Sequence, residues 1–262
     1  MNDRIALFFD IDGTLFDGKT KSILPSTLKA LEILKNKENT DIYLSTGRSH
    51  ETLGMMKSYS QYFRGMNLSN GQEIMIDGKF NYGEIFDKDV LSRLLDVSVK
   101  MNTPMGLILK NEIVMNFITE ASTYCFTTYI RNDVKNLNFE PFDLNQDVIQ
   151  IWLFATNDEI DEMKKSFPEL SFLKWGNYGA DVIPKGASKA RGIKHIQELM
   201  DYKLENMYAF GDGDNDVQMF KNVGTSVAMG NGSLKAKANA TFVTDDISED
   251  GLYKALLKLN LL

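Results

Sequence analysis

The chain is poor in cysteine and histidine, and it has no long apolar run. Cys125 is the single cysteine among 262 residues, which excludes an intrachain disulfide and is compatible with a reducing compartment. No apolar stretch is long enough to span a bilayer. Only five apolar residues, 5–9, precede Asp10, too few for the hydrophobic part of an export signal. We therefore expect a cytoplasmic protein that does not bind a membrane.

Basic residues are outnumbered by acidic ones. The sequence contains 29 lysines and arginines and 36 aspartates and glutamates, which gives a formal net charge of -7. The pI is about 5.0. Binding to nucleic acid draws on a basic surface that this balance does not supply, so no nucleic-acid partner is expected. A small anionic substrate is compatible with the sequence if a few cations lie near it. The sequence does not indicate a protein partner.

The two ends of the chain alternate strand-like and helix-like segments. Near the N-terminus, residues 5–11 resemble a buried strand, Pro25 opens a helix with leucines at helical spacing, and residues 41–45 resemble the next strand. Near the C-terminus, a predicted helix over residues 186–200 precedes strand-like segments at residues 207–211, 226–229 and 242–244. This rhythm is typical of βαβ units and predicts a doubly wound, mostly parallel α/β sheet.

The middle of the chain has a different pattern. Helix-like segments at residues 88–101 and 120–130 alternate with strand-like segments at residues 105–109, 113–118, 148–155, 171–175 and 181–183. Lys110, Asn111 and Glu112 are expected to form a hairpin turn, and Asn157 is expected to cap a further helix. We therefore predict an inserted α+β cap domain at residues 83–184, with a core domain formed by residues 1–82 and 185–262.

Polar side chains follow three of the predicted core strands. Because Asp10 and Asp12 lie two residues apart, they project to one face at the end of the first strand. The two other groups are Thr46-Gly47-Arg48 and Asp212-Gly-Asp214-Asn215-Asp216. Ligands of open α/β sheets bind beyond the carboxyl ends of the strands, so the three groups are expected to converge. Converging carboxylates require a cation, and oxygen-only donors favour Mg²⁺ over Zn²⁺.

A calcium loop of the EF-hand type is the main alternative for these acidic motifs. Such a loop needs glycine at its sixth position and glutamate at its twelfth. A loop starting at Asp10 would have Leu15 and Lys21 there, and a loop starting at Asp212 would have valine at both positions. The sequence therefore excludes an EF-hand at either motif.

Six motifs stand out along the chain. They are Phe-Phe-Asp10-Ile-Asp12-Gly-Thr-Leu, Ser45-Thr46-Gly-Arg48, Asn70-Gly71, Lys185-Gly-Ala-Ser-Lys189-Ala-Arg-Gly-Ile, Phe210-Gly-Asp212-Gly-Asp-Asn215-Asp216 and Val227-Ala-Met-Gly-Asn231. In this order they resemble the haloacid dehalogenase (HAD) superfamily of phosphotransferases, in its Cof-type sugar-phosphatase branch. The resemblance covers nearly the whole chain and implies a Rossmann-like core with a large α/β cap. The family usually has alanine where Gln72 and Gly232 stand, and glutamate where Asp181 stands.

The resemblance implies a role for each acidic residue of the motifs. Asp10 would be the nucleophile that forms an aspartyl-phosphate, and Asp12 would be the general acid and base. Mg²⁺ would be held by the carboxylates of Asp10 and Asp212 and by the backbone carbonyl of Asp12, with Asp216 supporting the metal or its waters. The implied activity is hydrolysis of a small phosphorylated metabolite, with sugar phosphates as the leading class.

The resemblance also implies which residues contact the substrate. The phosphoryl oxygens would be held by Thr46, Gly47, Lys189 and Asn215. Recognition of the leaving group is expected from three cap residues, Trp175, Asn177 and Tyr178, for which packing at the domain junction is an equally good explanation. Lys185 is an alternative phosphate-binding lysine, and the motif match favours Lys189 over it.

Two other functions stay open on the sequence. A phosphotransferase or phosphomutase would use the same aspartyl-phosphate, although the large cap favours simple hydrolysis. A regulatory protein that binds a phosphorylated ligand without catalysis would not need both a nucleophile and a proton donor. The presence of Asp10 and Asp12 together therefore weighs against the regulatory protein.

Overall fold

The computed structural model describes residues 3–110, 112–130, 137–139 and 142–262. The chain divides into two compact units. The first unit comprises Met1–Thr46, Ser58–Asn81 and Ser188–Leu262, and the second comprises Gly47–Lys57 and Tyr82–Ala187. The second unit thus consists of two segments that interrupt the first unit along the chain.

Among the described residues, the first unit carries a sheet of eight strands in the order β14-β13-β12-β1-β2-β3-β4-β5. Neighbouring strands from β14 to β3 are parallel, and β4 runs antiparallel to β3. This sheet confirms the predicted doubly wound, mostly parallel α/β core. The strands are β1 (Ile5–Phe9), β2 (Thr40–Ser45), β3 (Gly65–Leu68), β4 (Glu73–Ile76), β5 (Lys79–Gly83), β12 (Met207–Gly211), β13 (Thr225–Ala228) and β14 (Phe242–Val243).

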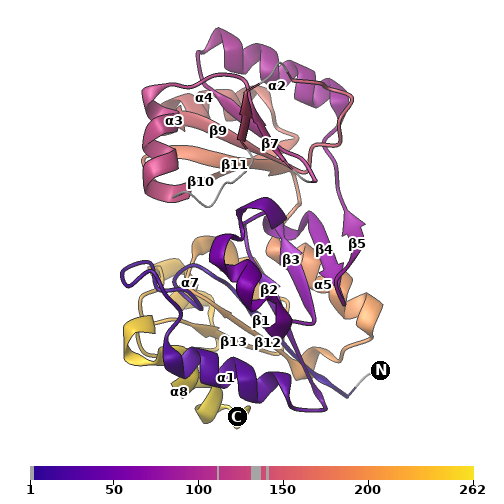
Figure 1. Ribbon diagram of the computed structural model, residues 1–262, viewed down its shortest axis with the longest axis vertical. Helices are drawn as coiled ribbons and strands as arrows, with labels where there is room; N and C mark the ends of the chain where they lie inside the picture. The colour runs from indigo at the N-terminus through magenta and orange to yellow at the C-terminus, as the bar shows by residue number, and fades with distance from the viewer. Residues whose placement is uncertain (1–2, 111, 131–136, 140–141) are drawn as a thin grey trace. The chain divides into compact units, whose positions relative to one another are not determined.

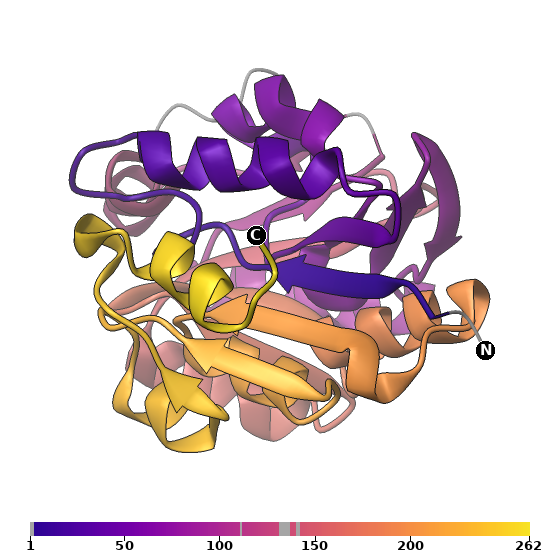
Figure 2. The same ribbon diagram turned by 90° about the horizontal axis from the view of Figure 1, so that it is seen from below.

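Strands β1 and β2 form the centre of this core. Residues 6–9 of β1 and all six residues of β2 are buried, which is typical of parallel strands covered on both faces. Helix α1 (Pro25–Lys35) begins with Pro25 in its first turn and buries Ala30, Leu31 and Leu34. It packs beside α8 (Gly251–Lys258), as Figure 1 shows. Figure 2 shows β1, in indigo, running beside β12, in orange.

The remaining helices of the core connect the strands and are mostly short. Helix α5 (Lys189–Met200) is the longest of them and begins at the cap residue Ser188. The others are α6 (Val217–Phe220), α7 (Leu234–Asn239) and the 3₁₀ turns η3 (Ser69–Gly71), η5 (Leu204–Asn206), η6 (Asp214–Asp216) and η7 (Ile247–Glu249). The 3₁₀ turn η1 (His50–Thr52) lies in the second unit, and η2 (Gly54–Tyr62) begins in the second unit and ends in the first. Within the described part of the chain, none of the helices has the length and apolarity that crossing a bilayer requires.

Among the described residues, the second unit carries a sheet of six strands in the order β10-β11-β9-β6-β7-β8. Neighbours pair antiparallel except β7 and β8, which are parallel. This mixture of strands and helices confirms the predicted α+β cap domain. The strands are β6 (Met105–Ile108), β7 (Ile113–Met115), β8 (Leu137–Phe139), β9 (Gln150–Thr156), β10 (Leu170–Lys174) and β11 (Tyr178–Pro184).

Two apolar clusters cover the two faces of the cap sheet. Alternate residues of β9 separate them: Ile151 and Leu153 belong to one cluster, and Trp152 and Phe154 belong to the other. The first cluster receives buried residues from α2 (Lys88–Lys100) and α4 (Asn157–Ser166). The second receives residues from α3 (Glu120–Cys125) and the π-helix η4 (Phe126–Ile130), and it is rich in aromatic rings.

Some sequence predictions for the cap need correction. Thr156, not Asn157, caps α4, because Thr156 Oγ1 accepts the Glu159 N–H while the Glu159 carboxylate accepts the Thr156 N–H at 2.7 Å. The single helix predicted over residues 120–130 changes from an α-helix to a π-helix after Cys125. Asn111, in the predicted hairpin turn, lies outside the described residues, while β6 and β7 on either side of that turn pair antiparallel.

Candidate active site

Asp10 and Asp212 follow two adjacent parallel strands of the core. In the pairing of β1 with β12, Phe9 lies opposite Phe210, and their rings stack with 4.8 Å between centroids. The Asp10 N–H donates to the Phe210 carbonyl oxygen at 2.9 Å, which fixes Asp10 at the end of its strand. The strand order reverses between β1 and β12, which is where ligand sites lie in doubly wound sheets.

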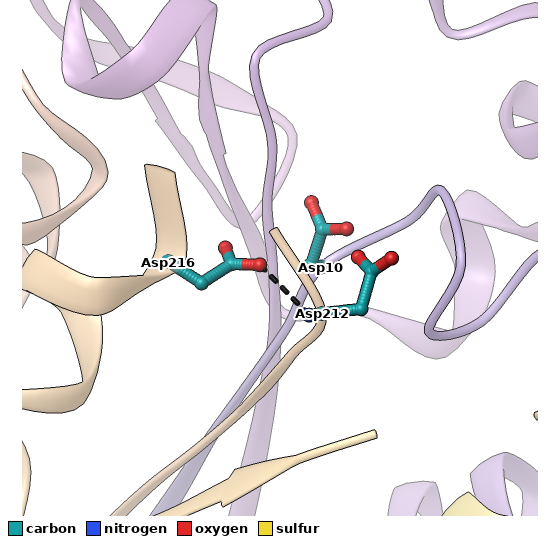
Figure 3. A group of neighbouring side chains, drawn as sticks. All are labelled: Asp10, Asp212 and Asp216. Carbon is teal, nitrogen blue, oxygen red and sulfur yellow. Dashed lines mark hydrogen bonds between the residues drawn. The ribbon is translucent and has the colours of Figure 1, made fainter. Parts of the chain in front are cut away.

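The carboxylates of Asp10, Asp212 and Asp216 come together at this point, as Figure 3 shows. One oxygen of each lies within 4.8 Å of the others. Asp216, at the end of η6, is completely buried. Its Oδ2 accepts the N–H groups of Asp212 and Gly213, both at 2.9 Å. The turn after β12 is therefore folded around the Asp216 carboxylate.

Lys189 supplies a cation to the acidic cluster. It is the first residue of α5, and only 1% of it is exposed. Its Nζ lies 2.5 Å from Asp10 Oδ1 and 2.6 Å from Asp216 Oδ1. Lys185, the alternative phosphate-binding lysine, is exposed and belongs to the second unit. The structure thus brings Lys189 into the cluster that the sequence predicted around Asp10.

One ammonium group faces three carboxylates in this cluster. Burial raises the pKa of Asp10 well above its ordinary value, and the charge of Lys189 only partly opposes this effect. Burial and the nearby Asp216 raise the pKa of Asp212 to about 7. Burial alone would lower the pKa of Lys189, but Asp10 and Asp216 outweigh it and raise that pKa. The excess negative charge and the oxygen-only donors fit a hard metal cation.

The turn after β1 brings Gly13 against Asp212. Gly13 has φ +81°, and a Cβ at this position would lie 2.2 Å from Asp212 Oδ2, so no other residue fits without displacing the carboxylate. The Gly13 N–H donates to the Phe16 carbonyl at 2.9 Å, which closes the turn. Asp12 is exposed at this turn, in contrast to the buried Asp10. The two acids of the first motif therefore occupy different environments.

Thr46 follows β2 and is held by its backbone. Its N–H donates to the Asn67 carbonyl at 2.9 Å, and its own carbonyl accepts the Asn70 N–H at 3.0 Å. Asn215 is exposed, with its amide nitrogen 3.5 Å from Asn70 Oδ1. The next residue, Gly47, falls in the second unit, where its carbonyl accepts the amide of Gln150.

The three predicted specificity residues lie at or near the β10–β11 turn of the cap. The Trp175 ring packs edge-on against Trp152 and Phe154, with centroid distances of 6.0 and 5.9 Å, so Trp175 has a clear packing role. The Tyr178 ring lies 5.3 Å from that of Tyr124. Asn177 is exposed between them. Recognition of a leaving group by these residues stays a prediction.

Three asparagines that support the site had no role in the sequence prediction. Asn231 donates to the Gly13 carbonyl at 2.8 Å and accepts the Ile247 N–H at 2.9 Å, so it holds the turn after β1. Asn70 joins Thr46 to Asn215, and Asn67 is buried in β3. Asn70 and Asn231 belong to two of the six sequence motifs. Asn67 belongs to none of them, and what marks it is that it is a polar residue in a buried strand.

Comparisons with known proteins agree with this geometry. A family model described as haloacid dehalogenase-like hydrolase matches residues 7–256. YkrA of Bacillus subtilis (strain 168) is 31% identical over 267 residues, covering 99% of each chain. The 5-amino-6-(5-phospho-D-ribitylamino)uracil phosphatase YcsE of the same organism is 28% identical over 249 residues, covering 94% of this chain and 92% of YcsE.

A solved structure gives the same result for the fold. The HAD subclass IIB sugar phosphatase BT4131 aligns with a TM-score of 0.89 and 29% identity, over 98% of this chain and 100% of that chain. The family match spans all segments of both units. This chain therefore belongs to the haloacid dehalogenase-like hydrolase family.

Proposed function

We propose that this chain is a Mg²⁺-dependent phosphatase of a small phosphorylated metabolite, with sugar phosphates as the leading class. The observation that carries the proposal is the contact of Lys189 Nζ with both Asp10 and Asp216 within a buried group of three carboxylates. Such a group offers a nucleophilic oxygen and a cation for an anionic substrate at the same point. The names of BT4131 as a sugar phosphatase and of YcsE as a phosphatase support the substrate class.

Asp10 acts as the nucleophile in this proposal. One carboxylate oxygen attacks phosphorus while the bond to the leaving alkoxide breaks, and an aspartyl-phosphate forms. Water then attacks the same phosphorus, the bond to Asp10 breaks, and orthophosphate leaves. The hydrogen bond from the Asp10 N–H to Phe210 holds the backbone of the nucleophile in place during both displacements.

Asp12 moves the proton. It gives a proton to the leaving alkoxide in the first displacement and takes one from the attacking water in the second, so the proton count balances. The exposure of Asp12 beside the buried Asp10 supports this division of roles, because water can reach the Asp12 carboxylate.

The remaining residues bind and orient the substrate. Mg²⁺ would be held by the carboxylates of Asp10 and Asp212 and by the Asp12 carbonyl, with Asp216 supporting the metal or its waters, and when bound it supplies positive charge that offsets the carboxylates and the phosphoryl group. Lys189 adds a fixed positive charge beside Asp10. In the same proposal, the phosphoryl oxygens are held by Thr46, Gly47, Lys189 and Asn215, and the leaving group is contacted by Trp175, Asn177 and Tyr178.

The test is phosphate release from an aryl phosphate in the presence of Mg²⁺, followed by a panel of sugar phosphates. Asp10→Asn should abolish release, because the amide is a poor nucleophile of nearly the same shape. Asp214→Asn is the matched control, since Asp214 lies in the third strand-end group, with Asp212 and Asp216, but is exposed and bonds to Ser233. It should keep its activity within about twofold.

Two further results would decide between hydrolysis and its competitors. In water labelled with ¹⁸O, hydrolysis places the label in the released orthophosphate, whereas transfer to another substrate leaves the orthophosphate pool unlabelled. Full activity in Asp10→Asn would refute the proposed nucleophile. Absence of phosphate release from every substrate tested would refute the phosphatase itself.

A further inference from the structure

Asn67 is a buried polar residue in a strand that is otherwise apolar at its buried positions. It is completely inaccessible and lies in β3 opposite Ser45, the last residue of β2. Its Nδ2 donates to Ser45 Oγ at 2.9 Å and to the Lys189 carbonyl oxygen at 2.8 Å. Its own backbone carbonyl accepts the Thr46 N–H at 2.9 Å. Asn67 therefore joins the end of β2 to the start of α5.

The orientation of the Asn67 amide is set by chemistry. A backbone carbonyl can only accept a hydrogen bond, so the NH₂ group must face Lys189. Its oxygen then faces Gly192 of α5, where a Cβ would lie only 1.9 Å from Oδ1. No hydrogen bond to this oxygen is found within the described residues. Gly192 thus leaves the space into which the amide fits.

An apolar side chain at this position would pack without leaving a buried polar atom unpaired. Burying an amide is unfavourable unless its polar groups are paired, and the Asn67 oxygen is buried without a partner among the described residues. The two hydrogen bonds that the Asn67 amide donates therefore have to offset the cost of burying its unpaired oxygen. Both bonds go to the neighbourhood of the proposed phosphate-binding residues. Ser45 precedes Thr46, and Lys189 carries the ammonium that contacts Asp10.

We propose that Asn67 is a positioning residue that fixes the separation between Thr46 and Lys189, and through it the fit of a phosphoryl group between them. This inference rests on the proposed phosphatase function. Asn67 itself does not touch the reacting atoms. Its backbone carbonyl accepts the Thr46 N–H, and its side-chain amide donates to the Lys189 carbonyl and to Ser45 Oγ beside Thr46. Loss of the amide therefore frees the start of α5 from the end of β2 and shifts the Lys189 ammonium relative to Thr46.

Two variants remove the proposed effect while keeping the shape of the side chain. Asn67→Leu keeps the branching and removes both donors. Asn67→Asp keeps the shape but places an acceptor against the Lys189 carbonyl. Tyr202→Phe is the matched structural control, because it removes a buried hydroxyl that bonds to Tyr43 and Asp41 in the same unit, near the start of β2 and away from its end.

Each protein is measured for kcat and KM with an aryl phosphate and Mg²⁺, for orthophosphate binding by calorimetry, and for melting temperature. Both Asn67 variants should lose about tenfold or more in kcat/KM and bind orthophosphate about fivefold or more weakly. Tyr202→Phe should lower the melting temperature and leave kcat/KM and orthophosphate binding within about twofold. If Asn67→Leu does not fold, Gly192→Ala, which pushes on Oδ1 and retains the amide, should weaken orthophosphate binding in the same direction.

A double variant tests whether Asn67 acts through Lys189. In a Lys189→Met background, Asn67→Asp should weaken orthophosphate binding no further, since the ammonium it positions is absent. Additive losses, or Asn67 variants within about twofold of the parent in both kcat/KM and orthophosphate binding, would overturn the inference. An inactive parent protein would instead refute the proposed phosphatase, and orthophosphate binding would still decide the role of Asn67.

Discussion

Lys189 and Asp216 form an ion pair whose two side chains are completely buried, with 2.6 Å between Nζ and Oδ1. The same ammonium contacts Asp10 at 2.5 Å. Removing one partner of a buried ion pair lowers the free energy of unfolding by far more than the intact pair contributes to it, because the other charge stays buried without compensation. Lys189 is therefore expected to stabilise the folded site in addition to supplying its positive charge.

Lys189→Met should damage both stability and activity. We expect the free energy of unfolding to fall by about 3–5 kcal/mol, since Asp216 would lose its buried counter-charge. We expect kcat/KM to fall by about a hundredfold or more. Urea unfolding and phosphate-release kinetics measure the two effects. Lys185→Met is the control, because Lys185 is exposed, and a larger loss of activity in that variant would reverse the assignment of the phosphate-binding lysine.

Mg²⁺ should stabilise the folded protein through the three-carboxylate cluster. At a concentration of about 100 times its dissociation constant, a cation that binds only the folded state adds about 2.7 kcal/mol to the free energy of unfolding. Addition of a chelator should remove this gain in a thermal scan. Asp212→Asn should lose most of the Mg²⁺-dependent shift, whereas Asp214→Asn should keep it. An equal shift in both variants would show that the ion binds elsewhere.

Asp41, near the start of β2, is expected to make an acid-sensitive contribution to the stability of the core. Burial alone would raise the pKa of Asp41, but hydrogen bonds from Arg4 and Tyr202 and the charge of Arg64 outweigh it and hold that pKa below its ordinary value of 3.8. A depressed pKa means that the ionised form stabilises the fold above pH 3.8 and that this contribution disappears as the pH falls through the lowered value.

Asp41→Asn tests this directly. At pH 7 the variant should be less stable by about 2 kcal/mol, because it loses charge-assisted hydrogen bonds to both arginines. Below pH 4 the difference from the parent should shrink, which urea unfolding at several pH values would measure. A difference that grows on acidification would contradict the assigned direction of the pKa shift.

Cys125 should be unreactive in the folded cap. It is buried in the aromatic cluster of the second unit, and burial raises the pKa of its thiol to about 12. Since the thiolate is the reactive form, a disulfide reagent at pH 8 should label the protein only after unfolding. Labelling of the native protein at the rate of a free thiol would show that this part of the cap opens readily.

The sequence predicted the elements whose signals are local. The buried run before Asp10, Pro25 at the start of α1 and the strand before Thr46 all carry their own pattern, and the structure has each of them. The predicted cap of α4, Asn157, lies one residue after the observed cap, Thr156, which forms a reciprocal pair with Glu159. Thr156 and Glu159 stand at capping-box spacing, so the local sequence does contain the signal for this cap.

Other features depend on partners that are distant in sequence. Asn67 bonds to Ser45 and to Lys189, which are 22 and 122 residues away, so no window along the chain reveals its role. The sequence does not predict strands β3, β4 and β5, since β3 contains this asparagine and a glycine and β5 is mostly exposed. Their place in the sheet follows from pairing of β3 with β2 and of β4 with β3, which is a property of the tertiary fold.

The position of β1 between β2 and β12 has a consequence for biosynthesis. A ribosome releases β1 and β2 early, but β12 emerges only after the entire insert. Until then one edge of β1 has no neighbour, and its apolar residues Phe8 and Phe9 lie beside an unformed half of the sheet. The nascent chain therefore carries an unpaired strand edge until β12 has emerged, and it can bring Asp10 together with Asp212 only after that.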